Sequence, residues 1–138
     1  MASLPLNFYF TTKDKNFKTS TIVVQDKPSY ISHSFVESPI YDLSDKKIGY
    51  KVSDDYIQEV ASNKYIVRLN NTYYIEGKGS ISWLYVFENN IPEIFYPVNV
   101  AAASTIISGT GDYFGKTGTV TLFPKSDGTR LVSISFTP

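Results

Sequence analysis

The sequence predicts an all-β fold, and three observations support this prediction. Apolar and polar residues alternate with a period of two through most of the chain, as they do in half-buried strands. Short clusters of Asp, Asn, Gly, Pro and Ser, which favour turns, separate the alternating segments. No segment carries an apolar stripe at the 3.6-residue spacing of a helix.

The strands follow in order from these patterns. In the first, Leu6, Phe8 and Phe10 alternate with polar residues and tyrosine, and Asp127-Gly128 is a hairpin signal between the last two. We expect strands at residues 5–11, 20–25, 30–36, 47–59, 64–75, 79–88, 98–107, 118–123 and 129–136. So many strands in one small chain predict a sandwich or a closed barrel. Closure removes exposed strand edges and therefore favours the barrel.

Four glycines, at positions 109, 111, 115 and 118, lie between the apolar Ile106-Ile107 and the alternating segment 119–122. Glycine adopts positive φ without steric cost. This spacing predicts a tight, irregular corner between two strands.

Composition and charge limit the function classes. The 138 residues fit a single domain spanning 1–138, and a hydrophobic content of 42% with 15% aromatics is sufficient for a packed core. Thirteen basic residues balance thirteen acidic ones, so no net field attracts nucleic acid or an anionic membrane. We therefore expect neither a nucleic-acid nor a membrane partner.

Several kinds of chemistry are not expected. The chain has no cysteine and one histidine, which argues against a metal site, and it contains neither a dinucleotide fingerprint nor a phosphate-binding loop. We expect no cofactor. The N-terminal segment lacks the basic and apolar parts of a signal peptide, and no apolar run reaches the ~20 residues of a membrane span. A cytoplasmic location is expected, with secretion left open.

Three segments resemble a known family. They are Ser38-Pro39-Ile40-Tyr41-Asp42-Leu43 followed by Lys47-Ile48-Gly49-Tyr50, then Gly77-Lys78-Gly79-Ser80-Ile81-Ser82-Trp83, and then the glycine corner from Ile107 to Val120. In this order they are similar to segments of the allene oxide cyclase and dirigent superfamily, whose members are eight-stranded antiparallel β-barrels. The resemblance covers residues 34–136, and the glycine corner is its most specific part.

This resemblance implies a homotrimer and a pocket that binds a hydrophobic small molecule and steers its cyclisation or coupling. The family's functional residues are not retained. Tyr9 stands where cyclases of the family have a glutamate, and Phe114 and Thr117 stand where dirigent proteins have arginines. Of the dirigent acidic pair before the proline, only Glu37 is present.

Glu37 and His33 are the candidate catalytic residues. Glu37 would be a general acid or base if its side chain points into the barrel mouth, where burial raises a carboxyl pKa; the alternative is a solvated carboxylate at the rim. His33 lies between Ile31 and Phe35 on an alternating strand and would face the cavity with them. The alternative for His33 is a hydrogen-bonded core or interface residue.

Aromatic side chains are the candidate ligand-binding residues. Ile81, Trp83, Tyr85 and Phe87 share one face of their strand. Buried tyrosines need hydrogen-bond partners and can orient a ligand. The candidates are Tyr9, Tyr41, Tyr50, Trp83 and Tyr85. A filled core without a cavity is the alternative.

Three charged residues complete the sequence-based predictions. Asp54-Asp55 is interpreted as a solvated pair in a bend, and Arg68 is expected on the outer face. Two hypotheses about function then remain. The chain is either a small-molecule-binding barrel, cyclase- or isomerase-like if it is an enzyme, or a structural protein that uses the barrel as an oligomeric building block.

Overall fold

The computed structural model describes residues 4–26 and 29–138, and they form nine β-strands and one short 3-10 turn. The all-β prediction is confirmed, and each expected strand segment overlaps an observed strand. The strands are β1 (Leu6–Thr11), β2 (Lys18–Gln25), β3 (Ile31–Asp42), β4 (Lys47–Ala61), β5 (Lys64–Ile75), β6 (Gly79–Asn89), β7 (Ala102–Gly109), β8 (Gly118–Pro124) and β9 (Thr129–Phe136). Within the described ranges, no helix is both long and apolar enough to cross a membrane.

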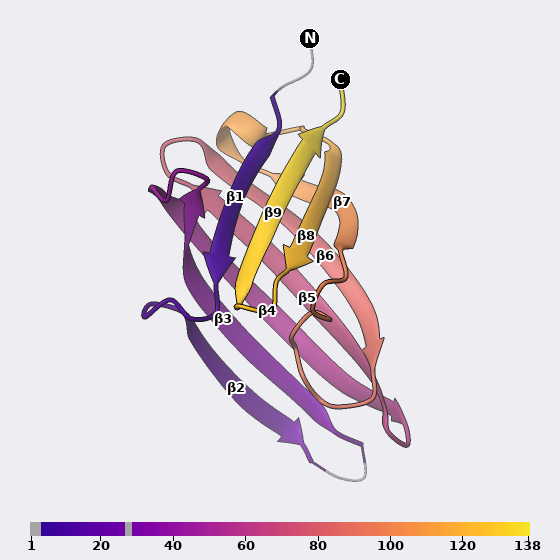
Figure 1. Ribbon diagram of the computed structural model, residues 1–138. Coiled ribbons are helices and arrows are strands. Elements are labelled where there is room, and N and C mark those ends of the chain that lie inside the picture. The colour runs from indigo at the N-terminus through magenta and orange to yellow at the C-terminus, as the bar shows by residue number, and fades with distance from the viewer. Residues whose placement is uncertain (1–3, 27–28) are drawn as a thin grey trace.

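The sheet closes into an antiparallel barrel (Figure 1). Its strand order is β1-β9-β8-β7-β6-β5-β4-β3-β2, and β1 also pairs with β3. β1 and β2 share one edge of β3, because β2 pairs with residues 31–37 and β1 with residues 41–42. The nine strands therefore occupy eight positions around the barrel, and the expected eight-stranded antiparallel barrel is confirmed.

β3 is longer than the sequence predicts and continues past residue 36, through Pro39, to Asp42. On the edge that β1 and β2 share, Ser38, Pro39 and Ile40 have no ladder partner among the described strands. A proline, which has no N–H to donate, is tolerated in a strand at such an unpaired position.

The glycine corner is present and joins β7 to β8. Residues 111–113 form the 3-10 turn η1, and Gly111 has a φ of 62°. A Cβ on Gly111 would lie 2.2 Å from the carbonyl oxygen of Lys78, so a larger residue does not fit there. The Asp112 amide donates to the same carbonyl at 2.7 Å. The corner is thus fastened to the β5–β6 turn.

Between this corner and the middle of the barrel, the interior is an apolar core. Phe8 packs edge-on against Tyr73, with 4.9 Å between the ring centres, and the Tyr73 hydroxyl accepts a hydrogen bond from the Trp83 indole at 3.0 Å. Buried aliphatic residues fill the rest: Ile40, Ile75, Ile81, Val120, Leu122, Val132 and Ile134. This half of the interior is occupied by side chains.

Candidate functional site

The other half of the barrel interior, called the polar half below, combines a cluster of buried polar and charged residues with the buried apolar side chains of Ile57, Val67 and Leu69. Strand β4 turns Lys51, Ser53 and Asp55 inward, and these residues are only 4%, 5% and 3% exposed. Charged residues are rarely buried to this extent without a partner or a function. This cluster is therefore the starting point of the candidate site.

The three side chains form a hydrogen-bonded relay. The Lys51 ammonium donates to Ser53 Oγ at 3.1 Å, and the Ser53 hydroxyl donates to Asp55 Oδ2 at 3.1 Å. The Lys51 ammonium also lies 4.9 Å from the centre of the Phe10 ring. The second oxygen, Asp55 Oδ1, is buried and has no hydrogen-bond partner within residues 4–26 and 29–138. An unpaired buried carboxylate oxygen is costly and is available to a ligand.

Burial moves the pKa values of both titratable groups toward 7. Desolvation lowers the pKa of Lys51 to about 8, although the Asp55 carboxylate opposes that change. Desolvation likewise raises the pKa of Asp55 to about 6, against the opposing effect of the Lys51 charge. An acid and a base with pKa values on either side of 7, linked by a hydroxyl, suit proton transfer.

Three further polar residues surround the relay. Asn71 on β5 is fully buried, and its amide donates to the Leu69 carbonyl. Tyr96 comes from the segment 90–101, which links β6 to β7, and its hydroxyl donates to Asn71 Oδ1 at 3.4 Å. Arg130 enters from the start of β9 and is 6% exposed. Four separate elements therefore meet here.

A cavity of about 30 Å³ lies among these groups, with room for about two water molecules. Its apolar walls include Phe10, Phe17 and Leu69, and its polar lining includes Lys51, Asp55, Asn71, Tyr96 and Arg130. A second hollow of about 180 Å³ lies beside it, between β2, β3 and the 90–101 segment. Ile94 and Phe95 line both hollows. This segment thus borders both spaces, and its displacement would enlarge the inner one.

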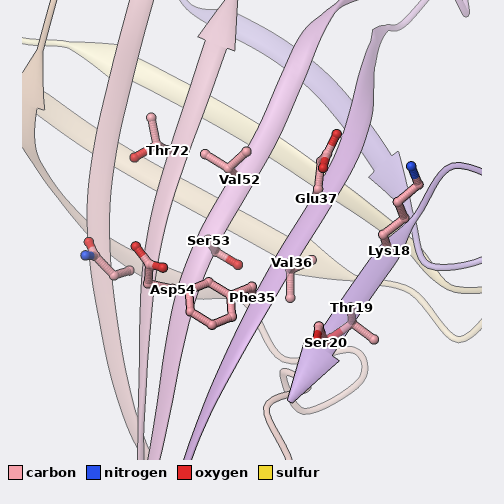
Figure 2. A pocket seen from close by; sticks show the side chains of 11 residues that line it. Lys18, Thr19, Ser20, Phe35, Val36, Glu37, Val52, Ser53, Asp54 and Thr72 are labelled. Atoms are coloured by element: carbon pink, nitrogen blue, oxygen red, sulfur yellow. The ribbon is translucent and has the colours of Figure 1, made fainter. Parts of the chain in front are cut away.

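A separate groove of about 400 Å³ lies on the outer surface of β2–β5. The strand register places its side chains in two rows, one of Lys18, Glu37, Val52 and Thr72 and one of Ser20, Phe35, Asp54 and Asn70. Figure 2 shows Phe35, Val52 and Glu37 projecting from neighbouring strands into this groove. Phe35 and Val52 are 43% and 46% exposed, which leaves an apolar patch on the outside.

The structure places Glu37 and His33 on this outer face, because Ser32, Ser34 and Val36 are the buried residues of β3 in that region. Glu37 lines the outer groove. His33 stacks on Tyr56, with 4.1 Å between ring centres, and its Nε2 lies 3.6 Å from Asp54 Oδ1. Neither residue lines the interior cavity. Glu37 follows its alternative of a rim carboxylate, whereas His33 lies on the outer face and not in the core.

Three of the candidate ligand-binding tyrosines have partners away from the interior cavity. The Tyr9 hydroxyl donates to Asp45 at 2.7 Å, which raises the Tyr9 pKa to about 12, and the Tyr41 hydroxyl donates to Asp14 at 2.6 Å. Tyr50 accepts a hydrogen bond from the Lys47 ammonium at 2.6 Å and is 38% exposed. The rings of Tyr9 and Tyr41 lie outside the barrel because Phe8, Phe10 and Ile40 occupy the inward positions of β1 and β3. The ring of Tyr50 lies outside because Gly49 and Lys51 are the inward residues of β4.

Trp83 and Tyr85 point inward, as the alternation along their strand predicts. Trp83 is fully buried in the core, and Tyr85 packs against Tyr96 with 5.9 Å between the ring centres. Tyr85 therefore supports the residue that closes the cavity.

Sequence reasoning did not identify the residues of the polar cluster: Lys51, Ser53, Asp55, Asn71, Tyr96 and Arg130. The interpretation of Asp55 as a solvated residue in a bend is wrong, because β4 runs unbroken there and turns Asp54 outward and Asp55 inward. The sequence does contain a signal for this cluster. Lys51, Ser53 and Asp55 are at alternate positions and therefore share one face of the strand, while Val52 and Tyr56 share the opposite face. On a strand that contributes to a cavity, the polar face can be the inner one.

In the described part of the chain, no three His, Asp or Glu side chains are grouped so that they could hold a metal ion.

The comparisons with known proteins concern the fold. No protein-family model matches the chain, and no curated protein matches it in sequence. Among solved structures, a pyocyanin demethylase superposes with a TM-score of 0.67 at 12% identity, over 97% of this chain and all of that one. AbnU, described as an exo-specific intermolecular Diels-Alderase, superposes with a TM-score of 0.61 at 14% identity, over 96% of each chain. The chain therefore shares its small β-barrel fold with both proteins.

Proposed function

We propose that this protein binds a small, mostly apolar organic molecule in the polar half of the barrel and moves a proton on it without a cofactor. The observation that carries the proposal is the buried Lys51–Ser53–Asp55 relay, which lines a cavity and has one unpaired carboxylate oxygen. Apolar walls with a few converging polar groups are typical of small-molecule sites.

The relay suits a keto–enol type of isomerisation. The Asp55 carboxylate takes a proton from a carbon next to a ligand carbonyl, and the Lys51 ammonium gives a proton to the carbonyl oxygen. The electron pair of the broken C–H bond becomes the C=C bond of the enol. The Ser53 hydroxyl then passes the proton from Asp55 back to Lys51, and the enzyme groups return to their starting forms.

Two further observations support a reaction of this class. An enol is a carbon nucleophile, and a ligand confined in the cavity can close a ring through it without a cofactor. The resemblance to the allene oxide cyclase and dirigent superfamily favours cyclisation of a hydrophobic molecule. A barrel with the same fold is described as a Diels-Alderase and another as a demethylase, which supports a catalytic use of the scaffold.

The first test is native mass spectrometry of the protein purified from cells, in gentle and then denaturing conditions. We expect a releasable small molecule on the wild-type protein. Asp55→Asn should lower the bound fraction several-fold, because it changes the unpaired oxygen in the cavity. Asp54→Asn is the matched control, since Asp54 is the neighbouring residue on the outer face and lines the outer groove.

Two outcomes would contradict the proposal. A protein that carries no small molecule would exclude the pocket interpretation. Loss of the ligand from Asp54→Asn, with retention in Asp55→Asn, would move the site to the outer groove and to Glu37.

A second candidate function is an oligomeric building block, and the outer face of β2–β5 favours it. Ile22, Phe35 and Val52 are apolar and between 43% and 55% exposed there. An apolar patch of this kind is typical of a surface that another subunit covers. A homotrimer, as the family resemblance implies, is the proposed state.

Association through this face predicts that Phe35→Asp with Val52→Asp lowers the mass of the assembly to that of one chain in the same native mass spectrometry experiment. Phe114→Asp is the control, because Phe114 is 82% exposed in the glycine corner, away from β2–β5. A wild-type protein that is already monomeric would contradict this second proposal.

A further inference from the structure

Arg130 is a partly buried cation without an ion-pair partner. Its residue is 6% exposed, and within the described residues no carboxylate oxygen lies within 4.0 Å of its guanidinium. Its one hydrogen bond is a long contact of 3.4 Å from Nη1 to the Lys125 carbonyl. A guanidinium has five N–H donors, so most of the Arg130 donors form no hydrogen bond within the described protein.

The charges inside the barrel do not balance. Lys51 and Asp55 are joined through Ser53 and offset each other. Arg130 adds a second positive charge, and among residues 4–26 and 29–138 no other charged side chain lines the cavity. The Asp127 carboxylate has a favourable electrostatic effect on Arg130, but it forms no ion pair with it at the distance above. A charge that is partly withdrawn from water gains from pairing with an anionic ligand group.

The position of Arg130 directs it toward the ligand space. It lines the same cavity as Lys51, Asp55 and Asn71. The planar guanidinium matches the two oxygens of a carboxylate, with which it forms paired, charge-assisted hydrogen bonds. The aromatic and aliphatic walls of the cavity, including Phe10, Phe17 and Leu69, suit the body of a carbon skeleton.

We propose that the ligand is an organic acid, whose carboxylate pairs with Arg130 while its carbon skeleton contacts the apolar walls. This inference rests on the proposed function, since it assigns the ligand class of the same cavity. It gives Arg130 a binding role that is separate from the proton transfer between Lys51 and Asp55.

The test measures binding of matched acid and amide probes by calorimetry and by ligand-observed NMR. The acids are phenylacetate, cinnamate and hexanoate, and each is compared with its own amide. We expect at least one acid to bind about tenfold or more tightly than its amide. Inorganic phosphate, which lacks an apolar body, should not compete with that acid.

Arg130→Met removes the charge and should abolish the acid–amide difference. The matched control is Arg68→Met, because Arg68 is the chain's only other arginine and stacks on Tyr56 at the outer face. The control should keep the full difference. Arg130→Lys should restore part of it, and circular dichroism of each variant confirms that it is folded.

The outcomes separate this inference from the proposed function. If acids and amides bind equally, or if Arg130→Met keeps the preference, the organic-acid inference is overturned while the pocket stands. If none of the acids binds more tightly than its amide, the inference also falls. Failure of the proposed function is seen independently, as a protein purified without any small molecule.

Discussion

The two halves of the barrel interior differ in chemistry although the same strands build both. On β9, Ile134 faces the half near the glycine corner and Arg130 faces the opposite half. On β5, Ile75 and Tyr73 lie in the apolar half and Asn71 lies beside the polar cluster. The fold therefore does not impose the polarity of the interior. One half holds the barrel together, and the other is free to carry a site.

The largest expected effect concerns the apolar half. Phe8→Ala should lower the free energy of unfolding by about 3–5 kcal/mol, because it removes a buried ring that packs on Tyr73 and leaves a cavity. Urea unfolding measures this change. Phe114→Ala is the control and should have little effect, since Phe114 is 82% exposed. A loss below about 1 kcal/mol for Phe8→Ala would mean that the two halves do not differ as described.

The next effect concerns the polar half and depends on pH. The pKa of Asp55 is about 6 in the folded protein and 3.8 as a free group, so the folded state binds the proton more tightly. Stability from this group is fully present below pH 3.8 and is lost as the pH rises to about 6, by about 3 kcal/mol. The contribution of Lys51 to stability changes with pH in the opposite direction. Its folded pKa of about 8 lies below the ordinary 10.5, so its contribution is present above pH 10.5 and lost as the pH falls to about 8.

Urea unfolding of the wild type at a series of pH values, compared with Asp55→Asn, checks this prediction. In Asp55→Asn, the free energy of unfolding should no longer decline between pH 4 and 6. It should still rise above pH 8, because Lys51 is still present. Asp54→Asn should keep both changes, since Asp54 lies on the outer face. A wild-type profile that is flat from pH 4 to 6 would show that Asp55 is solvated.

The smallest expected effect concerns the outer face. Glu37→Gln and His33→Ala should leave ligand binding unchanged, because neither residue lines the interior cavity. Surface changes of this kind alter stability by about 0.5 kcal/mol or less. The measurement is ligand retention in native mass spectrometry. If Glu37→Gln released the ligand, the outer groove would replace the barrel interior as the site.

Most of the fold follows from the sequence. Alternation along residues 6–10 and 81–87 predicts which side chains share a face of β1 and of β6, and the four glycines predict the corner before β8. These features are local, and local sequence determines them. The extension of β3 through Pro39 was not predictable in this way. It depends on how β1 and β2 divide the edge of β3, which is a property of the closed barrel.

The site was harder to predict for a related reason. A rule that places apolar side chains inside predicts the wrong inward face for β4. In the structure Lys51 and Asp55 point inward, and Val52 and Tyr56 point outward. The same rule directs His33 inward through its neighbour Phe35, and the structure directs both outward. Tyr96 lies on a connecting segment with no alternation at all. Only closure of the barrel brings these residues together.

The small size of the inner cavity has a consequence for the rate of binding. A space of about 30 Å³ accommodates water but not an organic acid, and Ile94, Phe95 and Tyr96 border it. The proposed binding of an organic acid therefore requires the 90–101 segment to move away. The observed rate of association then reaches a plateau at high ligand concentration, and this plateau equals the rate at which the segment opens. Association is therefore slower than diffusional encounter. Once the segment returns, the same barrier slows escape, so a modest affinity is compatible with a long residence time.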